Sequence, residues 1–196
     1  LHPARTALAS RISVLIVTMW LNGCSLLNKV IWCERSVKYS RNFEAALVYA
    51  TQLHDGHFRK ATDVPYVNHL LAVASLVGEA GGSEDEVIAA LLHDAVEDQG
   101  GQPTLDKIRD LFGDKVAQIV LGCSDTDVVP KPPWEQRKAA YIQHVNDASE
   151  SILLVSCADK LHNARSIVAD SRQIGEELWD RFTATKEQTL WYYQSL

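Results

Sequence analysis

The sequence predicts an all-α protein, and three observations favour this fold class. From Arg41 onward, apolar residues recur at the three- and four-residue spacing of amphipathic helices. Capping residues and Gly or Pro breaks bound the segments. No stretch alternates apolar and polar residues over a useful length, as a half-buried strand would. We therefore expect a single helical bundle of about seven or eight helices over residues 41–196.

The first helices are bounded by recognisable start and stop signals. Asn42 is predicted to cap a helix that reaches about Asp55. A loop with Pro65 follows, and a second helix is expected over roughly residues 67–80, where Gly81-Gly82 ends it.

A capping box starts the next helix, because Glu86 stands three residues after Ser83. This helix carries the stretch ALLHDAVED, residues 90–98, and Gly100-Gly101 ends the segment. Thr104 is predicted to cap the helix after it. The remaining helices are expected at about residues 104–112, 114–122, 135–147, 150–169 and 174–194. Between them, SDTDVVPKPPW has three prolines and is predicted to be a loop.

Composition limits the classes of function. The chain has 196 residues, 46% of them hydrophobic, which suits one globular domain with a sizeable core. A net charge of -6 argues against nucleic-acid binding, so a polyanionic small substrate would need a local cationic site or a metal. The four cysteines have no metal-binding or redox spacing and are expected to be reduced, as in a cytoplasm.

Residues 1–40 are an N-terminal extension that allows three readings. Arg5 and Arg11 precede an apolar run of about 13 residues, which is too short to span a bilayer. We favour an apolar helix or translated upstream sequence, and a signal-like segment with a lipoprotein-type cleavage box is the alternative. A membrane location is expected only under that alternative.

ALLHDAVED concentrates ionisable groups within an apolar segment. If the helix is continuous, His93 lies over Glu97 and Asp94 over Asp98, because positions four apart share a face. Unpaired charge is too costly to bury. The stretch therefore predicts either a salt-bridge network or a metal site.

Two other segments place similar groups in similar settings: PYVNHL contains His69, and SCADKLHNAR contains Asp159. Together with His93 and Asp94 they give two imidazoles and two carboxylates. Such a set suits Mn²⁺, Fe²⁺ or Zn²⁺ better than Ca²⁺. Taken alone, each residue has an ordinary reading: a histidine within the core, or an aspartate paired with a nearby cation.

In combination, the phrases PYVNH, AALLHDAVED, FGDKVAQIV and ADKLHNAR resemble the HD phosphohydrolase superfamily, and within it the hydrolase domain of RelA/SpoT proteins. The resemblance covers about residues 43–170 and is closest to the stand-alone small alarmone hydrolases. It implies a single metal ion, usually Mn²⁺, and hydrolysis of the 3′-pyrophosphate of guanosine tetraphosphate or pentaphosphate. The products would be pyrophosphate and GDP or GTP.

The resemblance also implies roles for individual residues. The matched metal ligands are His69, His93, Asp94 and Asp159. Glu97 and Asp98 match the acidic pair that activates or orients the attacking water. Arg59, Lys60 and Asn163 match residues that contact the nucleotide.

The sequence departs from the family pattern in three places. Leu70 follows His69 where proline is common, Asp63 adds negative charge to the substrate loop, and Ser124-Asp125 only partly matches a threonine-aspartate pair. Two alternatives therefore stay open: a hydrolase for another nucleotide, such as an adenine-based alarmone or a nucleoside phosphate, and a nucleotide-binding module with a vestigial metal site.

Overall fold

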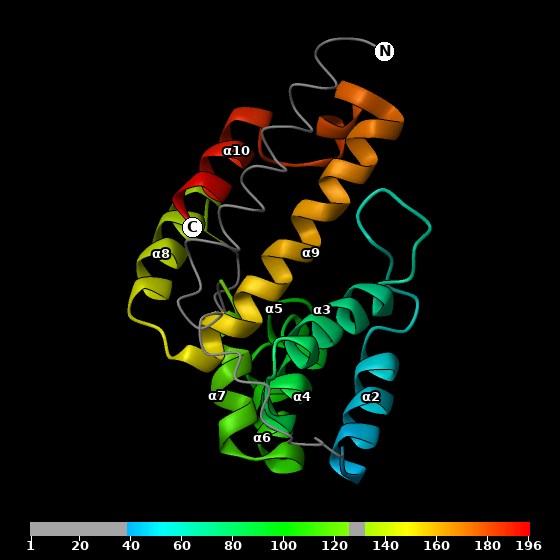
Figure 1. The fold of residues 1–196 in the computed structure, drawn as a ribbon, viewed down its shortest axis with the longest axis vertical. Coiled ribbons are helices and arrows are strands. Elements are labelled where there is room, and N and C mark those ends of the chain that lie inside the picture. The colour runs from blue at the N-terminus through cyan, green and yellow to red at the C-terminus, as the bar shows by residue number, and fades with distance from the viewer. Residues whose placement is uncertain (1–38, 126–131) are drawn as a thin grey trace. The chain divides into compact units, whose positions relative to one another are not determined.

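The computed structural model describes residues 39–125 and 132–196. These residues belong to two compact units, one ending at Asp159 and the other comprising Lys160–Leu196. Within the described ranges, the regular elements are helices, with one isolated β-bridge between Phe58 and Pro65 (Figure 1). The all-α prediction is confirmed. The N-terminal extension up to residue 38 and most of the SDTDVVPKPPW loop lie outside the described residues.

Helix α2, Arg41–Leu53, begins with a different cap from the one predicted. Ser40 is the N-cap, and its hydroxyl accepts a hydrogen bond of 3.1 Å from the backbone N–H of Asn42. An N-cap needs extended backbone, which Ser40 has at φ −88° and ψ −177°, whereas Asn42 is already helical. The predicted cap at Asn42 was therefore wrong by two residues.

The boundaries of helix α3, Val67–Glu79, and the start of helix α4, Glu84–Leu92, agree with the sequence prediction. The predicted capping box is present at the start of α4, and the Glu86 carboxylate accepts a hydrogen bond of 2.6 Å from the backbone N–H of Ser83. The same carboxylate also accepts a bond of 2.7 Å from the Ser151 hydroxyl. Glu86 thus ties the start of α4 to the start of α9, Glu150–Ile174.

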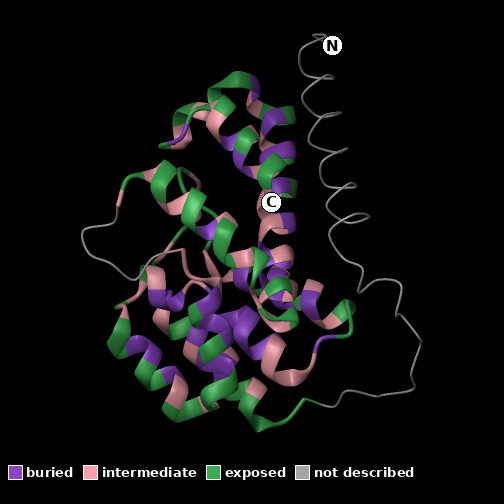
Figure 2. Cartoon of the chain, turned by 90° about the vertical axis from the view of Figure 1, so that its left-hand side faces the viewer, coloured by how far each residue is buried: buried purple, intermediate pink, exposed green. Residues whose placement is uncertain are grey.

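Helix α4 lies in the middle of the core of its unit. It packs against α2, α3 and α7, Asp114–Cys123. All six residues from 87 to 92 are buried, and Figure 2 shows buried positions in purple. A helix that is apolar on every side is stable only when neighbours cover all of its faces. This packing fixes the position of the residues at its C-terminal end.

The helix through ALLHDAVED is not continuous, which corrects the prediction. Helix α4 ends at Leu92, and α5 is a separate four-residue helix, Ala95–Asp98. His93 and Asp94 form the turn between them, where Asp94 has φ −93° and ψ −3°. The one-face argument for His93 over Glu97 therefore does not hold. The break turns His93 and Asp94 toward a common point.

Further helix boundaries differ from the prediction. Helix α9 reaches Ile174, whereas its end was expected at about residue 169. Helix α6, Gln102–Phe112, begins two residues before Thr104, because Gly101 takes the N-cap position at φ 62° and Pro103 fits the first turn. The Thr104 hydroxyl instead donates to the carbonyl oxygen of Gln99 at 2.6 Å.

The predicted helix over residues 174–194 is in fact two elements. A 3₁₀ helix, η2, covers Gly175–Arg181, and α10 covers Lys186–Ser195. Thr185 starts α10 with a capping box of its own, a signal that the apolar spacing concealed. Helix α8 covers Trp134–Asn146. None of the helices in the described part of the chain is long and apolar enough to cross a membrane.

Candidate metal and catalytic site

His69 enters the site from the first turn of α3. Its imidazole is almost completely buried, with 1% of the residue exposed. Leu70, which replaces the common proline, simply continues the helix and is fully buried in the core. Leucine in place of proline at position 70 therefore leaves His69 on a helix that the buried Leu70 side chain anchors to the core.

His93 is the C-cap residue that follows α4, and a hydrogen bond to the last turn of that helix fixes its orientation. Its Nδ1 lies 2.8 Å from the carbonyl oxygen of Ala90, so Nδ1 carries the proton and donates it there. The other nitrogen, Nε2, is buried and has no well-directed hydrogen-bond partner in the described structure. With Nδ1 bonded to Ala90, Nε2 is the nitrogen that faces the other candidate ligand atoms, which is the orientation required of a metal-binding histidine.

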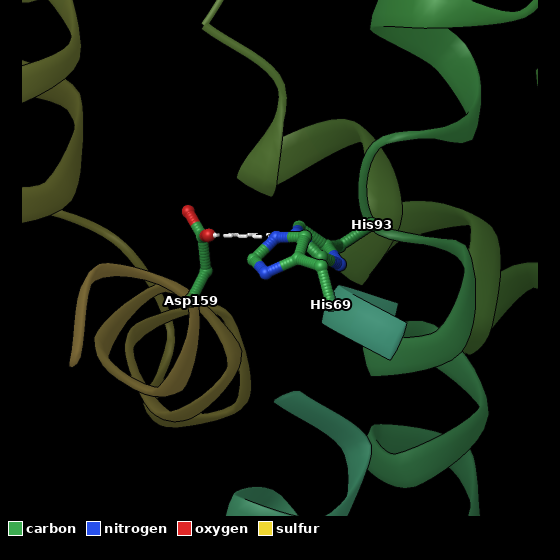
Figure 3. A group of neighbouring side chains, drawn as sticks. All are labelled: His69, His93 and Asp159. Carbon is green, nitrogen blue, oxygen red and sulfur yellow. Dashed lines mark ion pairs between the residues drawn. The ribbon is translucent and has the colours of Figure 1, made fainter. Parts of the chain in front are cut away.

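Four side chains converge at this point. His69 Nε2 lies 3.2 Å from Asp159 Oδ1 and 3.5 Å from Asp94 Oδ2. His93 Nε2 lies 3.1 Å from Asp94 Oδ2 and 3.6 Å from Asp159 Oδ1. Figure 3 shows His69, His93 and Asp159 directed toward one another from three separate segments.

The charges of these groups are strongly coupled. Burial by itself lowers the pKa of His93, but the carboxylates of Asp94 and Asp159 outweigh burial and raise it well above the usual value. Burial likewise raises the pKa of Asp94, but the charge of His93 and the closeness of both imidazoles bring it well below the usual value. In this arrangement a proton on His93 supplies the positive charge that the two carboxylates require.

A divalent cation can supply that charge instead. One ligand atom each from His69, His93 and Asp159 all lie within 4.8 Å of one another, and the three residues are buried. Two imidazole nitrogens with a carboxylate oxygen suit a divalent transition ion. The residues present therefore fit a metal, and the metal reading is favoured over a purely internal salt-bridge network.

A layer of aromatic rings that the sequence analysis missed lies behind the site. The Tyr66 hydroxyl donates a hydrogen bond of 2.5 Å to Asp94 Oδ2. The Tyr66 ring stacks on His57 and on His54, with centroids 4.2 and 5.2 Å apart. Burial lowers the pKa of His54 to about 4, although the charge of Asp94 opposes this. PYVNH contains Tyr66, but nothing in that phrase shows that its hydroxyl reaches a residue 28 positions away.

The acidic pair Glu97-Asp98 lies in α5, directly after the turn at His93 and Asp94. The charge of Asp98 is one of the causes that raise the pKa of Tyr66, after burial and the nearer Asp94. Glu97 Oε1 lies 3.9 Å from Nη1 of Arg137, a cation that the sequence analysis did not single out. Arg137 stands 40 positions after Glu97, so only the folded chain reveals the pair.

The proposed nucleotide contacts are placed on two elements. Arg59 and Lys60 lie in the loop between α2 and α3, which is closed by a hydrogen bond of 2.8 Å from Arg59 N to Val64 O. Arg59 is half-buried and Lys60 is exposed. Asn163 is half-buried in α9, four residues after Asp159 and in the other compact unit. Their contacts with a nucleotide stay predictions.

An all-α core that brings two histidines and two aspartates together in this order is typical of phosphohydrolases of the HD type. The chain belongs to the HD-domain family, whose match extends over residues 46–187.

Individual relatives agree with this assignment. The chain is 36% identical over 132 residues to a Xenopus tropicalis protein named guanosine-3′,5′-bis(diphosphate) 3′-pyrophosphohydrolase MESH1, covering 63% of this chain and 71% of that one. Identity to the Danio rerio protein of the same name is 37% over 122 residues, covering 61% and 65%. A solved metazoan orthologue of SpoT, described as hydrolysing ppGpp and acting in starvation responses, superposes with a TM-score of 0.61 and 25% identity over 81% of this chain and 95% of that one.

Proposed function

We propose that this protein hydrolyses the 3′-pyrophosphate of guanosine tetraphosphate or pentaphosphate, releasing pyrophosphate and GDP or GTP. The observation that supports this most strongly is the convergence of His69, His93, Asp94 and Asp159 immediately before the Glu97-Asp98 pair. The similarity to proteins named for this activity indicates the substrate class.

We propose that the four converging residues hold one Mn²⁺ ion. When bound, such an ion provides Lewis acidity, which polarises a phosphoryl oxygen and makes water acidic near neutral pH. Asp94 joins the ligand set because its Oδ2 is already within 3.5 Å of both imidazole nitrogens. The His93 ring needs no reorientation, since its bond to Ala90 points Nε2 into the site.

In this proposal Glu97 and Asp98 are the catalytic carboxylates. Either can accept a proton from the attacking water or align that water, a contribution on the order of 10²- to 10⁴-fold in rate. Their place on α5, directly after His93 and Asp94 in the chain, supports this role. A pure binding module would not need such a pair.

Cationic and polar groups would hold the nucleotide phosphates. With a net charge of -6, the protein repels a polyanion overall, so attraction must come from local residues. We assign Arg59 and Lys60 to the phosphates and Asn163 to the ribose, as the resemblance implies. A small-molecule nucleotide in the cytoplasm is the expected partner, and residues 41–196 are expected to work as one hydrolase domain.

The test is pyrophosphate release from guanosine tetraphosphate by the full chain loaded with Mn²⁺. His93→Ala should lose both metal and turnover, because a ligand is removed. Glu97→Gln should keep the metal, measured by elemental analysis, but lose roughly 10²- to 10⁴-fold in kcat. Glu79→Gln is a matched control on the exposed end of α3 and should behave like the wild type.

The outcomes separate the three readings. Turnover of guanosine tetraphosphate that disappears in Glu97→Gln supports the proposal. Turnover only of adenine-based alarmones or nucleoside phosphates would identify another nucleotide hydrolase. Tight nucleotide binding without turnover by the wild type would identify a binding module and overturn the proposal.

A further inference from the structure

Arg137 of α8 lies between two carboxylates that are far apart in the sequence. Its Nη1 donates hydrogen bonds of 2.8 and 2.7 Å to the two carboxylate oxygens of Asp125, and lies 3.9 Å from Glu97 Oε1. The three side chains are 15%, 5% and 22% exposed, respectively, so solvent screens this cluster only weakly.

Several contacts hold the Arg137 end of this cluster in place. The guanidinium Nε also donates to the carbonyl oxygen of Pro132 at 3.1 Å. Lys138 Nζ donates to Asp125 Oδ2 at 2.5 Å. Burial raises the pKa of Asp125, but the charge and the hydrogen bond of Lys138, together with the charge of Arg137, lower it below its usual value. Asp125 is therefore an ionised, well-anchored partner for Arg137, whose guanidinium in turn faces Glu97.

Glu97 has little support from its own helix. Helix α5 has only four residues, and a single helical turn is marginal by itself. A catalytic carboxylate must nevertheless be held closely, since a displacement of about 1 Å can cost on the order of 10²-fold in rate. Its position must come from tertiary contacts.

We infer that Arg137 and Asp125 form a clamp that sets the position of the Glu97 carboxylate. They are positioning residues that act through Glu97. This inference rests on the catalytic role proposed above for Glu97. It also assigns a role to the aspartate of Ser124-Asp125, the pair that only partly matches the family's threonine-aspartate pair. Asp125 holds the Arg137 side chain in place.

A double-mutant cycle in the full Mn²⁺-loaded chain tests the clamp. Arg137→Gln is expected to lower kcat on guanosine tetraphosphate roughly 10- to 100-fold, with KM and metal affinity nearly unchanged. In the Glu97→Gln background the same change should cost little more, because the carboxylate to be positioned is absent. If the reductions in kcat caused by Arg137→Gln and Glu97→Gln instead multiply in the double variant, the two residues act independently and the clamp is overturned.

Conservative and matched variants guard against a purely structural explanation. Arg137→Lys keeps the charge but not the planar guanidinium, so it should recover only part of the kcat while folding like the wild type. Arg109→Gln removes an arginine of α6 that also lies between two aspartates, Asp106 at 2.9 Å and Asp114 at 3.2 Å. Arg109→Gln should leave kcat unchanged in the wild type. In the Glu97→Gln background it should likewise cause no further change in kcat.

A second measurement separates this inference from the proposed function. If the wild type releases no pyrophosphate from guanosine tetraphosphate, the proposed function fails. The clamp is then tested by urea unfolding of the wild type, the two single variants and the double variant. Non-additive midpoint shifts for Arg137→Gln and Glu97→Gln support the clamp. Additive shifts, as expected for Arg109→Gln with Glu97→Gln, overturn it.

Discussion

The Tyr66 hydroxyl donates a hydrogen bond of 2.5 Å to Oδ2 of Asp94, the same oxygen that lies 3.1 Å from His93 Nε2. This bond connects the loop before α3 to the turn after α4. Burial, with the charge of Asp94 and this bond, raises the pKa of the phenol, so Tyr66 stays a donor across the physiological range. Groups that orient metal ligands in this way tune affinity without touching the ion.

Removing this hydroxyl should weaken metal binding. Tyr66→Phe keeps the ring stacked on His57 but leaves Asp94 without its donor. We expect Mn²⁺ affinity to fall on the order of 10- to 100-fold, measured by competition with a chelating indicator. Tyr39→Phe, another tyrosine whose ring stacks on a neighbour, is the control and should bind Mn²⁺ like the wild type. Equal affinity in Tyr66→Phe and the wild type would show that the hydroxyl does not orient Asp94.

Metal affinity should depend on pH through His93. The neighbouring carboxylates raise the pKa of this imidazole in the metal-free protein, so binding must displace a proton, whereas Asp94, with its lowered pKa, is already ionised. Affinity should therefore drop about tenfold for each unit that the pH falls while one proton is displaced. Titrations with Mn²⁺ at pH 6, 7 and 8 measure this slope. A flat profile would mean that His93 is already neutral.

His54 should make the fold sensitive to acid. Burial lowers its folded pKa to about 4, from an unfolded value near 6.5, so this histidine contributes stability that is present above pH 6.5 and lost as the pH falls through 4. The loss by pH 4 is on the order of 3 kcal/mol at 1.36 kcal/mol per pKa unit. Urea unfolding at several pH values should show a shallower acid dependence for His54→Gln than for the wild type. Parallel profiles for the two proteins would contradict the assignment.

The loop cations should affect substrate binding and leave the metal alone. Arg59→Gln and Lys60→Gln are each expected to raise KM for guanosine tetraphosphate about 10-fold or more, because a hydrogen bond to a charged group contributes about 1.5–3 kcal/mol. Steady-state kinetics with parallel metal analysis test this. Lys115→Gln, which removes an exposed lysine paired with Asp85 at 3.0 Å, is the matched control. An unchanged KM in both loop variants would remove them from the substrate site.

The sequence by itself determined the fold class, most helix boundaries and the four side chains that the structure brings together. Helical periodicity and caps such as Ser83 with Glu86 are local signals, so they can be read without the folded chain. His69, His93, Asp94 and Asp159 were identified through their phrases, and the structure brings them together.

Tertiary structure decided the geometry that local patterns do not encode. Apolar spacing predicted one helix through ALLHDAVED, whereas the chain breaks at His93-Asp94 to aim both side chains at one point. The contacts of Tyr66 with Asp94 and of Arg137 with Asp125 and Glu97 join residues 12 to 40 positions apart. Such pairs depend on how helices pack, because the energy that selects them comes from burying several segments at once.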